Sequence, residues 1–135
     1  MEAIVAPVHD ARELESVIAA QARTPNSGLF VLPDPFTNTY RVEIVSLAAH
    51  YRLPAVYAFR FYTELGGLLS YGNDWNDNFR HAATYAARIL RGDKPSELPV
   101  QAPTNYELVI NLKTAKALGL DVPLFLQQLA NKVIE

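Results

Sequence analysis

Short apolar runs alternate with amphipathic segments over the first two-thirds of the chain. The runs at 3–7, 28–32, 55–59 and 68–71 are bounded by Pro, Gly or Asn and predict buried strands. Asp10 and Glu13 have the spacing of a helix N-cap and its reciprocal partner, and Thr37 or Asn38 is expected to open a second helix. The apolar positions at helical spacing are Leu14, Val17 and Ile18 in the first helix and Tyr40, Ile44, Leu47, Ala48 and Tyr51 in the second.

This order of elements is βαβαβ. Strands that alternate with helices are joined by right-handed crossovers, which place the strands in a parallel sheet with helices on both faces. The pattern therefore predicts an α/β fold, a three-layer Rossmann-like lobe with a mostly parallel sheet.

A further amphipathic helix is predicted after Gly72. Asn76 or Asp77 is expected to cap it, and Gly92 stands where a left-handed residue ends a helix. Pro95 prevents its continuation, and the proline-rich stretch 95–103 is typical of a linker. The residues expected to face inward are Phe79, Ala82, Ala83, Ala86, Ile89 and Leu90.

The last part of the chain predicts a strand and two helices. Residues 106–110 alternate as a strand does, and Asn111 is expected to cap a short helix that ends at Gly119. Pro123 opens a final helix, with an apolar face expected to consist of Leu126, Leu129 and Val133.

Composition narrows the function classes. The 135 residues, half of them apolar, fit one domain, and the formal net charge of −2 offers no broad basic surface for nucleic acid. No apolar run approaches the ~18 residues of a membrane span, so the chain is not expected to be membrane-embedded. No secretion signal is recognised, and the absence of cysteine excludes disulfides and thiolate metal sites without deciding the compartment.

Enzymatic motifs are missing as well. His9, His50 and His81 fall in different predicted elements, and no metal-binding His spacing occurs. The sequence also lacks the Gly-x-Ser-x-Gly elbow of hydrolases and the glycine-rich loops that cradle a nucleotide phosphate. We therefore expect no catalysis, no cofactor and no metal.

Three segments together resemble one protein family. They are Glu64-Leu-Gly-Gly-Leu-Leu-Ser-Tyr-Gly72, Arg88-Ile-Leu-Arg-Gly-Asp-Lys-Pro-Ser-Glu-Leu-Pro-Val100 and Tyr106-Glu-Leu-Val-Ile-Asn-Leu-Lys-Thr-Ala-Lys-Ala-Leu-Gly-Leu120. In this order and spacing they resemble the C-terminal part of substrate-binding proteins of ABC importers, in the branch that includes tryptophan-binding members. The resemblance implies the type I periplasmic-binding-protein fold, in which two lobes close on a small ligand, together with an ABC permease partner and a periplasmic location.

The same resemblance divides the chain between the two lobes. Residues 1–135 would form one α/β domain that begins with the second lobe, and the strand and helix at about 68–92 would be an arm belonging to a first lobe that this chain lacks. The fold expected is thus a truncated type I periplasmic-binding-protein fold. Because the arm would expose an apolar face, we expect a second copy to cover it in a homodimer.

Candidate ligand contacts follow from a rule for open α/β sheets, whose ligands lie beyond the carboxyl ends of the strands. The predicted loops there suit a small zwitterionic or aromatic ligand: an acid for an ammonium, an arginine for a carboxylate, and rings for a flat apolar part. The residues are Asp34, Phe36, Arg60, Tyr71, Asn73 and Asp74, with Trp75 as a further aromatic. Relatives that bind aromatic amino acids carry a Thr-Asp-Asn-like loop where this chain has Leu32-Pro33-Asp34-Pro35, so that only Asp34 carries over.

Other interpretations of these residues stay open. Asp34 before Pro35 is also a common start of a helix, Arg60 at a strand end is often a surface ion-pair partner, and Trp75 also suits an interface. The sequence thus supports a solute-binding component that performs no chemistry, or alternatively a non-catalytic oligomerising protein without a functional ligand site. A receiver-type domain ranks last, because only Asp10 provides an acid after the first predicted strand.

Overall fold

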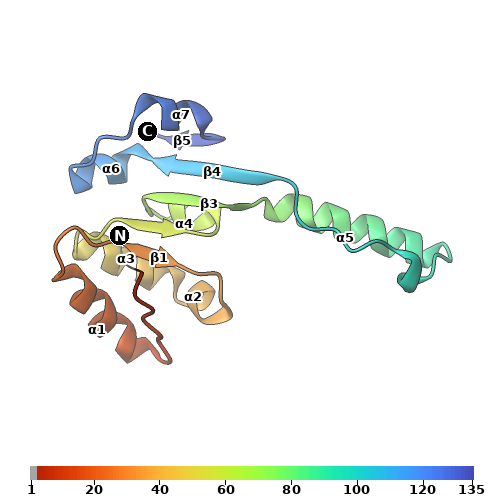
Figure 1. Cartoon of the computed structure of the whole chain (residues 1–135), viewed down its shortest axis with the longest axis horizontal. Helices are drawn as coiled ribbons and strands as arrows, with labels where there is room; N and C mark the ends of the chain where they lie inside the picture. The colour runs from red at the N-terminus through yellow and green to blue at the C-terminus, as the bar shows by residue number, and fades with distance from the viewer. Residues whose placement is uncertain (1–2) are drawn as a thin grey trace.

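The computed structural model describes residues 3–135, which form one five-stranded sheet in the order β1-β2-β3-β4-β5. Every neighbouring pair is parallel except β3 and β4, which are antiparallel. The predicted α/β class with a mostly parallel sheet is confirmed (Figure 1). In chain order the elements are α1 (Ala11–Ala22), β1 (Leu29–Val31), α2 (Pro35–Thr39), α3 (Arg41–His50), β2 (Ala55–Tyr57), α4 (Arg60–Glu64), β3 (Leu69–Asn73), α5 (Trp75–Leu90), the 3-10 turn η1 (Pro95–Glu97), β4 (Tyr106–Asn111), α6 (Leu112–Leu118), α7 (Leu124–Leu129) and β5 (Lys132–Ile134).

One hydrophobic core lies between β2 and the helices α1, α3 and α4. Tyr57 of β2 is buried and stacks on Tyr62 of α4, with their ring centroids 4.8 Å apart. The Tyr62 hydroxyl donates a hydrogen bond to Asn38 Oδ1 at 3.1 Å, which satisfies its polar end. The core residues are Leu14 and Ile18 of α1, Ile44, Val45 and Ala48 of α3, Leu53, Ala55 and Tyr57 around β2, and Tyr62 of α4.

The opposite face of the same strands is much less covered. Successive side chains of a strand alternate between faces, so Phe30 and Tyr71 point away from this core. Phe30 is 67% exposed and Tyr71 57% exposed. The second helical layer expected from the sequence is therefore not seen over these two residues.

The expected strand at 3–7 is wrong. Residues 3–9 have no regular structure, and Ile4 and Val5 are 70% and 89% exposed. An apolar run forms a strand only where its backbone groups pair with a neighbouring strand. The sheet ends at β1, whose only neighbour is β2, so residues 3–7 pair with no strand. Pro7 also lacks the N–H that a ladder needs.

The expected start of the second helix, at Thr37 or Asn38, is also wrong. Helix α2 begins at Pro35, and Asp34 caps it by accepting a hydrogen bond from the Phe36 N–H at 2.7 Å. Tyr40, with φ −92° and ψ 18°, then separates α2 from α3. At the first helix the Asp10 cap is confirmed, whereas Glu13 accepts from the His9 N–H, one residue before the cap.

Helix α5 is the element that departs most from its prediction. Its cap is Asp74, not Asn76 or Asp77, because the Asp74 carboxylate accepts from both of those N–H groups. None of its residues is buried, so the expected inward face is wrong. Figure 1 shows α5 as an arm that extends beyond the ends of β3 and β4, with the proline-rich segment running back beside it.

The prediction for the C-terminal region is confirmed only for its first half, up to Gly119. Asn111 caps α6, and Gly119 ends it in the left-handed conformation with φ 73°. The final helix, however, ends at Leu129, and Val133 lies in β5 rather than on a helical face. Asn131 explains why a strand follows α7 instead of more helix. Its N–H donates to the Leu108 carbonyl and its Oδ1 accepts from the Leu108 N–H, both at 2.8 Å, which attaches the chain to β4.

Candidate functional site

The carboxyl ends of the parallel strands β1, β2 and β3 lie side by side along one end of the sheet. Since β4 is antiparallel to β3, its first residues lie at the same edge, and Glu107 stands in register with Gly72. The long arm α5 starts from this edge as well. We call this region the cleft edge, and it unites residues that are far apart in the sequence.

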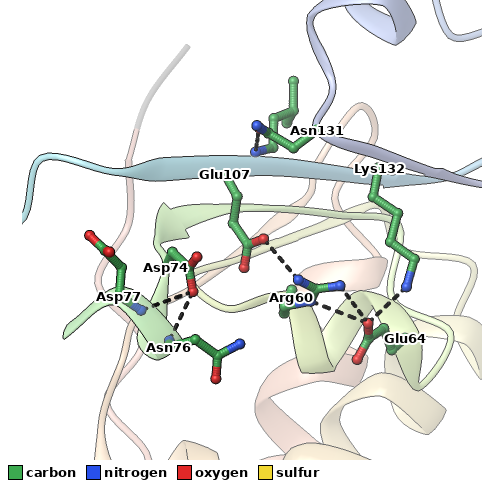
Figure 2. A network of polar contacts seen from close by, with 9 residues as sticks. Arg60, Glu64, Asp74, Asn76, Asp77, Glu107, Asn131 and Lys132 are labelled. Carbon is green, nitrogen blue, oxygen red and sulfur yellow. Dashed lines mark hydrogen bonds and ion pairs between the residues drawn. The ribbon is translucent and has the colours of Figure 1, made fainter. Parts of the chain in front are cut away.

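Arg60 is the centre of a charged network at the cleft edge (Figure 2). Its Nε and Nη2 donate to Glu64 Oε1 at 3.2 and 3.1 Å, and its Nη1 donates to Glu107 Oε2 at 3.2 Å. The Lys132 ammonium also donates to Glu64 Oε1, at 3.0 Å. A guanidinium has five N–H donors, so the three bonds that Arg60 makes within residues 3–135 leave two donors for another partner.

The two glutamates differ in their electrostatic surroundings. The hydrogen bond from Lys132 holds the pKa of Glu64 below its ordinary value, and the bond from Arg60 adds to this effect. The pKa of Glu107 is raised instead, first because burial disfavours its charged form, while Arg60 opposes the rise. Glu107 is therefore the less well satisfied carboxylate of the network.

Aromatic rings form a row at the same end of the sheet, after β2 and β3. Trp75 meets Phe59 edge-on at 4.9 Å between centroids and Phe61 at 6.2 Å, and it contacts Phe79 at 6.0 Å. The guanidinium of Arg41 lies 6.0 Å from the Phe61 centroid, within cation–π range. Trp75 itself remains 43% exposed, so the row presents a partly open apolar surface.

Both acids that the sequence proposed for an ammonium are used as helix caps. Asp34 Oδ1 binds the Phe36 N–H, and Asp74 Oδ1 binds the Asn76 N–H at 2.8 Å. The helix start proposed as the other interpretation of Asp34 is thus confirmed. Phe36 lies on α2 and packs its ring against Tyr40 at 4.6 Å.

Tyr71 and Asn73 lie on the other face of the sheet from Arg60 and Glu107. Both alternate with Gly72, which shares its face with Glu107. Tyr71 stacks on Tyr106 with ring centroids 5.8 Å apart, and Asn73 is in register with Tyr106. Of the six proposed site residues, the structure brings Arg60 and Asp74 to the Glu107 carboxylate and sets Tyr71 and Asn73 apart from it.

A hollow in the surface lies elsewhere. It has a volume of about 510 Å³ and lies between α6 and the segment that leads into α7, lined by Leu112, Lys116, Leu120 and Gln127 among others. This hollow lies at the other end of the strands, where β4 ends and α6 begins. Within residues 3–135, no three His, Asp or Glu side chains gather as a metal site, and no helix has the length and apolarity to cross a membrane.

Sequence reasoning missed Glu64, Glu107 and Lys132 as parts of the cleft edge. The available signal was the period of two along β4, which puts Glu107 on the same face as Val109 and Asn111, both of them buried. Its proximity to Arg60 depends on the antiparallel pairing of β3 with β4, which joins residues 47 positions apart. No local pattern carries that information.

Comparisons with known proteins agree with this architecture. A conserved domain protein from Vibrio cholerae O1 biovar El Tor has 28% identity and a TM-score of 0.80 over 90% of this chain. An ABC domain from Streptococcus pneumoniae, solved in complex with L-Trp, has 25% identity and a TM-score of 0.81 over 91%. A ligand-free, open substrate-binding protein with adhesive properties from Clostridium difficile, at 20% identity over 94% of the chain and TM-score 0.64, shares the fold.

This chain spans only 41–42% of the length of those three structures. No curated protein matches it. Its sequence does match a family described as ABC transporter substrate binding protein, and the match extends over residues 2–134. The chain therefore belongs to the ABC transporter substrate-binding protein family.

Proposed function

We propose that this chain is a solute-binding component of an ABC importer and binds a small molecule at the cleft edge without transforming it. The observation that carries the proposal is that one end of the sheet holds both Arg60, which keeps two N–H donors free among residues 3–135, and the aromatic row of Phe59, Phe61 and Trp75. An arginine recognises carboxylates by paired hydrogen bonds, and aromatic rings bind flat apolar groups. The ligand class is an amino acid or a small aromatic or organic acid.

The position of the site supports this function. Ligands of open α/β sheets lie beyond the carboxyl ends of the strands, and the cleft edge is that end of β1, β2 and β3. A similar structure was solved with L-Trp, although its ligand is a property of that protein. Asp34, Phe36, Tyr71, Asn73 and Asp74 border the same strand ends and remain candidate contacts.

The arm at 68–92 is proposed to belong to the other lobe of the binding protein. Pockets bury ~70–90% of a ligand, whereas the cleft edge supplies one wall. We therefore expect weak binding by this chain alone and tighter binding once a second wall faces it. Family membership supports an ABC permease as the protein partner and the periplasm as the compartment.

Binding is tested by calorimetry and ligand-observed NMR with amino acids and small aromatic or organic acids. At least one carboxylate-bearing compound is expected to bind, with a Kd in the micromolar to millimolar range. Arg60→Lys keeps the charge but loses the planar fork, so it should weaken that binding by about 10-fold. Arg12→Lys, on the exposed surface of α1, is the matched control.

If the protein is folded and binds none of these compounds, the proposal is contradicted. It would favour the second candidate, a non-catalytic oligomerising protein without a functional ligand site. One observation supports that candidate: the chain exposes 9383 Å², whereas a compact monomer of 15.0 kDa exposes ~7,000 Å². Such an excess suits a molecule that buries further surface against a partner, and a homodimer is the simplest form.

A further inference from the structure

One face of the arm helix α5 is apolar and uncovered. Phe79 and Leu90 are 66% and 88% exposed. Positions three, four or seven apart share one face of a helix, and the exposed apolar residues of α5 follow this spacing. We call this surface the arm face, and it consists of Trp75, Phe79, Ala82, Ala83, Ala86 and Leu90, all of them exposed within residues 3–135.

The other side of α5 is already occupied. The Asp77 carboxylate accepts a hydrogen bond from Asn105 Nδ2 at 2.7 Å, and the Tyr85 hydroxyl donates to the Pro99 carbonyl at 2.6 Å. Figure 1 shows the segment between α5 and β4 running back beside the helix. This segment therefore lies on the polar side of α5 and leaves the arm face free.

The sizes of the side chains along the arm face follow an order. Large side chains stand at both ends of α5, and alanines lie in the middle. If two such helices run in opposite directions, Phe79 of one copy lies level with Ala86 of the other, Ala82 with Ala83, and Trp75 with Leu90. Large then meets small beside the centre, and the alanines let the two backbones approach closely.

A parallel pair would fit less well. Phe79 would face Phe79 and Ala86 would face Ala86, so a bulge would stand next to a gap. Such a gap removes van der Waals contacts that a close-packed interface needs. The antiparallel direction is the one in which the arm face complements itself.

We infer that the arm face is the interface of a two-fold dimer, in which α5 of a second copy packs antiparallel across it. The two-fold axis passes between Ala82 and Ala83. The occupant is a second copy because a surface that complements itself forms a closed pair. This inference does not depend on solute binding at the cleft edge.

The area and shape of the molecule allow this dimer. The chain exposes 9383 Å², about 2,300 Å² more than a compact monomer of 15.0 kDa, and a stable interface needs ~800 Å² from each partner. Helix α5 is roughly 24 Å long. Because it extends beyond the ends of β3 and β4 (Figure 1), the sheets of two copies would stand at opposite ends of the helix pair.

The dimer also buries no charge. Asp77 pairs with His81 at 3.3 Å, and Arg88 pairs with Asp93 at 2.7 Å, all outside the arm face. Arg80 stands at its margin, where the charged head of a long side chain can stay in water. The interface thus gains from apolar burial without the cost of removing an ion from water.

The test uses the absence of cysteine from the chain, because a single introduced cysteine then reports contact between two copies. In Ala83→Cys the two sulfurs would lie next to the two-fold axis, within reach of a disulfide. Mild oxidation of the whole chain at micromolar concentration should link most of this variant into dimers.

Ala86→Cys tests the direction of the pair. In the antiparallel dimer its two sulfurs are about 10 Å apart along the helix axis, so this variant should link about 10-fold more slowly than Ala83→Cys. Thr84→Cys is the matched control, because Thr84 is exposed and lies outside the arm face. It should link no faster than Ala86→Cys.

Each outcome decides the matter. If Ala83→Cys links no faster than Thr84→Cys, the inference is overturned, and α5 is covered by something other than its own copy. Equal linking of Ala83→Cys and Ala86→Cys indicates a parallel pair and overturns it as well. All three positions are exposed, so the variants should fold, and circular dichroism verifies this.

Sedimentation of the wild-type protein gives an answer that needs no variant. A monomer up to the highest micromolar concentrations overturns the inference by itself. Solute binding is measured separately, so the failure of this inference leaves the proposed function standing, and the failure of solute binding leaves this interface standing.

Discussion

At Gly72, β3 passes close to the backbone that follows β2. A Cβ placed on Gly72 would lie 1.9 Å from the carbonyl oxygen of Ala58, a backbone atom that cannot move aside. Ala58 leads into Arg60 and Gly72 stands opposite Glu107, so this close approach lies between the two halves of the charged network. A side chain here would push them apart.

We predict that Gly72→Ala destabilises the fold by about 3 kcal/mol or more, because an overpacked core contact has to be relieved by moving backbone. Urea unfolding followed by circular dichroism measures the change. Gly92→Ala is the control: its Cβ meets nothing within 4 Å, and its φ of 110° makes the cost one of backbone strain only, about 1 kcal/mol. Equal costs at the two positions would refute the close approach.

Glu64 gives the charged network a dependence on pH. Its pKa in the folded protein is below the ordinary 4.5, so ionised Glu64 stabilises the fold above that pH. The stabilisation is lost as the pH falls through the lowered pKa. Glu107 acts in the opposite sense, since its raised pKa means that its charge disfavours folding until it is protonated.

We predict that the stability difference between the wild-type protein and Glu64→Gln shrinks as the pH falls from about 6 to 3. Thermal unfolding at a series of pH values measures it. Glu107→Gln should show the reverse trend, with its largest relative benefit above the raised pKa. A constant difference for Glu64→Gln across this range would mean that the bonds from Lys132 and Arg60 do not persist in solution.

At the scale of elements, α5 is a well-capped helix that has little to pack against. Asp74 caps it, and Tyr85 donates a hydrogen bond to the Pro99 carbonyl at 2.6 Å, which ties it to the proline-rich segment. Phe79 and Leu90 nevertheless remain 66% and 88% exposed. A helix of 16 residues is only marginally stable in water without tertiary packing.

We predict that the backbone amides of α5 exchange with solvent much faster than those of α3 in a dilute sample. Helix α3 contributes Ile44, Val45 and Ala48 to the core, so its amides open only with the whole domain. Hydrogen exchange followed by mass spectrometry measures both helices in one experiment. If the two are protected equally at the lowest concentration, α5 is covered in solution by something else.

At the scale of the whole molecule, the solvent-accessible area is larger than that of a compact monomer of the same mass. The excess over a compact monomer is roughly 2,300 Å², and exposed apolar residues of α5 and of the uncovered sheet face contribute to it. Stable interfaces bury ~800 Å² per partner. There is therefore enough surface for self-association.

We predict a dimer at micromolar concentration in sedimentation velocity. The double variant Phe79→Ser with Leu90→Ser should shift the population to monomer, because it removes apolar contacts from the arm. Folding of the domain should be little affected, since neither residue is buried. Substitution of the exposed Val100 by Ser is a matched control outside the helix, and a compact wild-type monomer would contradict the prediction.

Local patterns were enough for much of the fold. Strands β1, β2, β3 and β4, the Asp10 cap of α1, and the Asn111 and Gly119 boundaries of α6 all follow from residues within a few positions of one another. Strand β5 was missed because its three residues become a strand only through Asn131, which binds the backbone of Leu108. The apolar face of α5 was predicted to point inward, because periodicity shows that a helix has an apolar face but not which element packs against it.

The sequence by itself determined the family, the α/β class and the edge at which Arg60 lies, because these depend on short motifs and on the order of elements. Tertiary structure decided the partners of that arginine. The antiparallel return of β4 brings Glu107 to Arg60, and the pairing of β5 with β4 brings Lys132 to Glu64. Contacts between residues 47 and 68 positions apart depend on strand pairing, which no local pattern encodes.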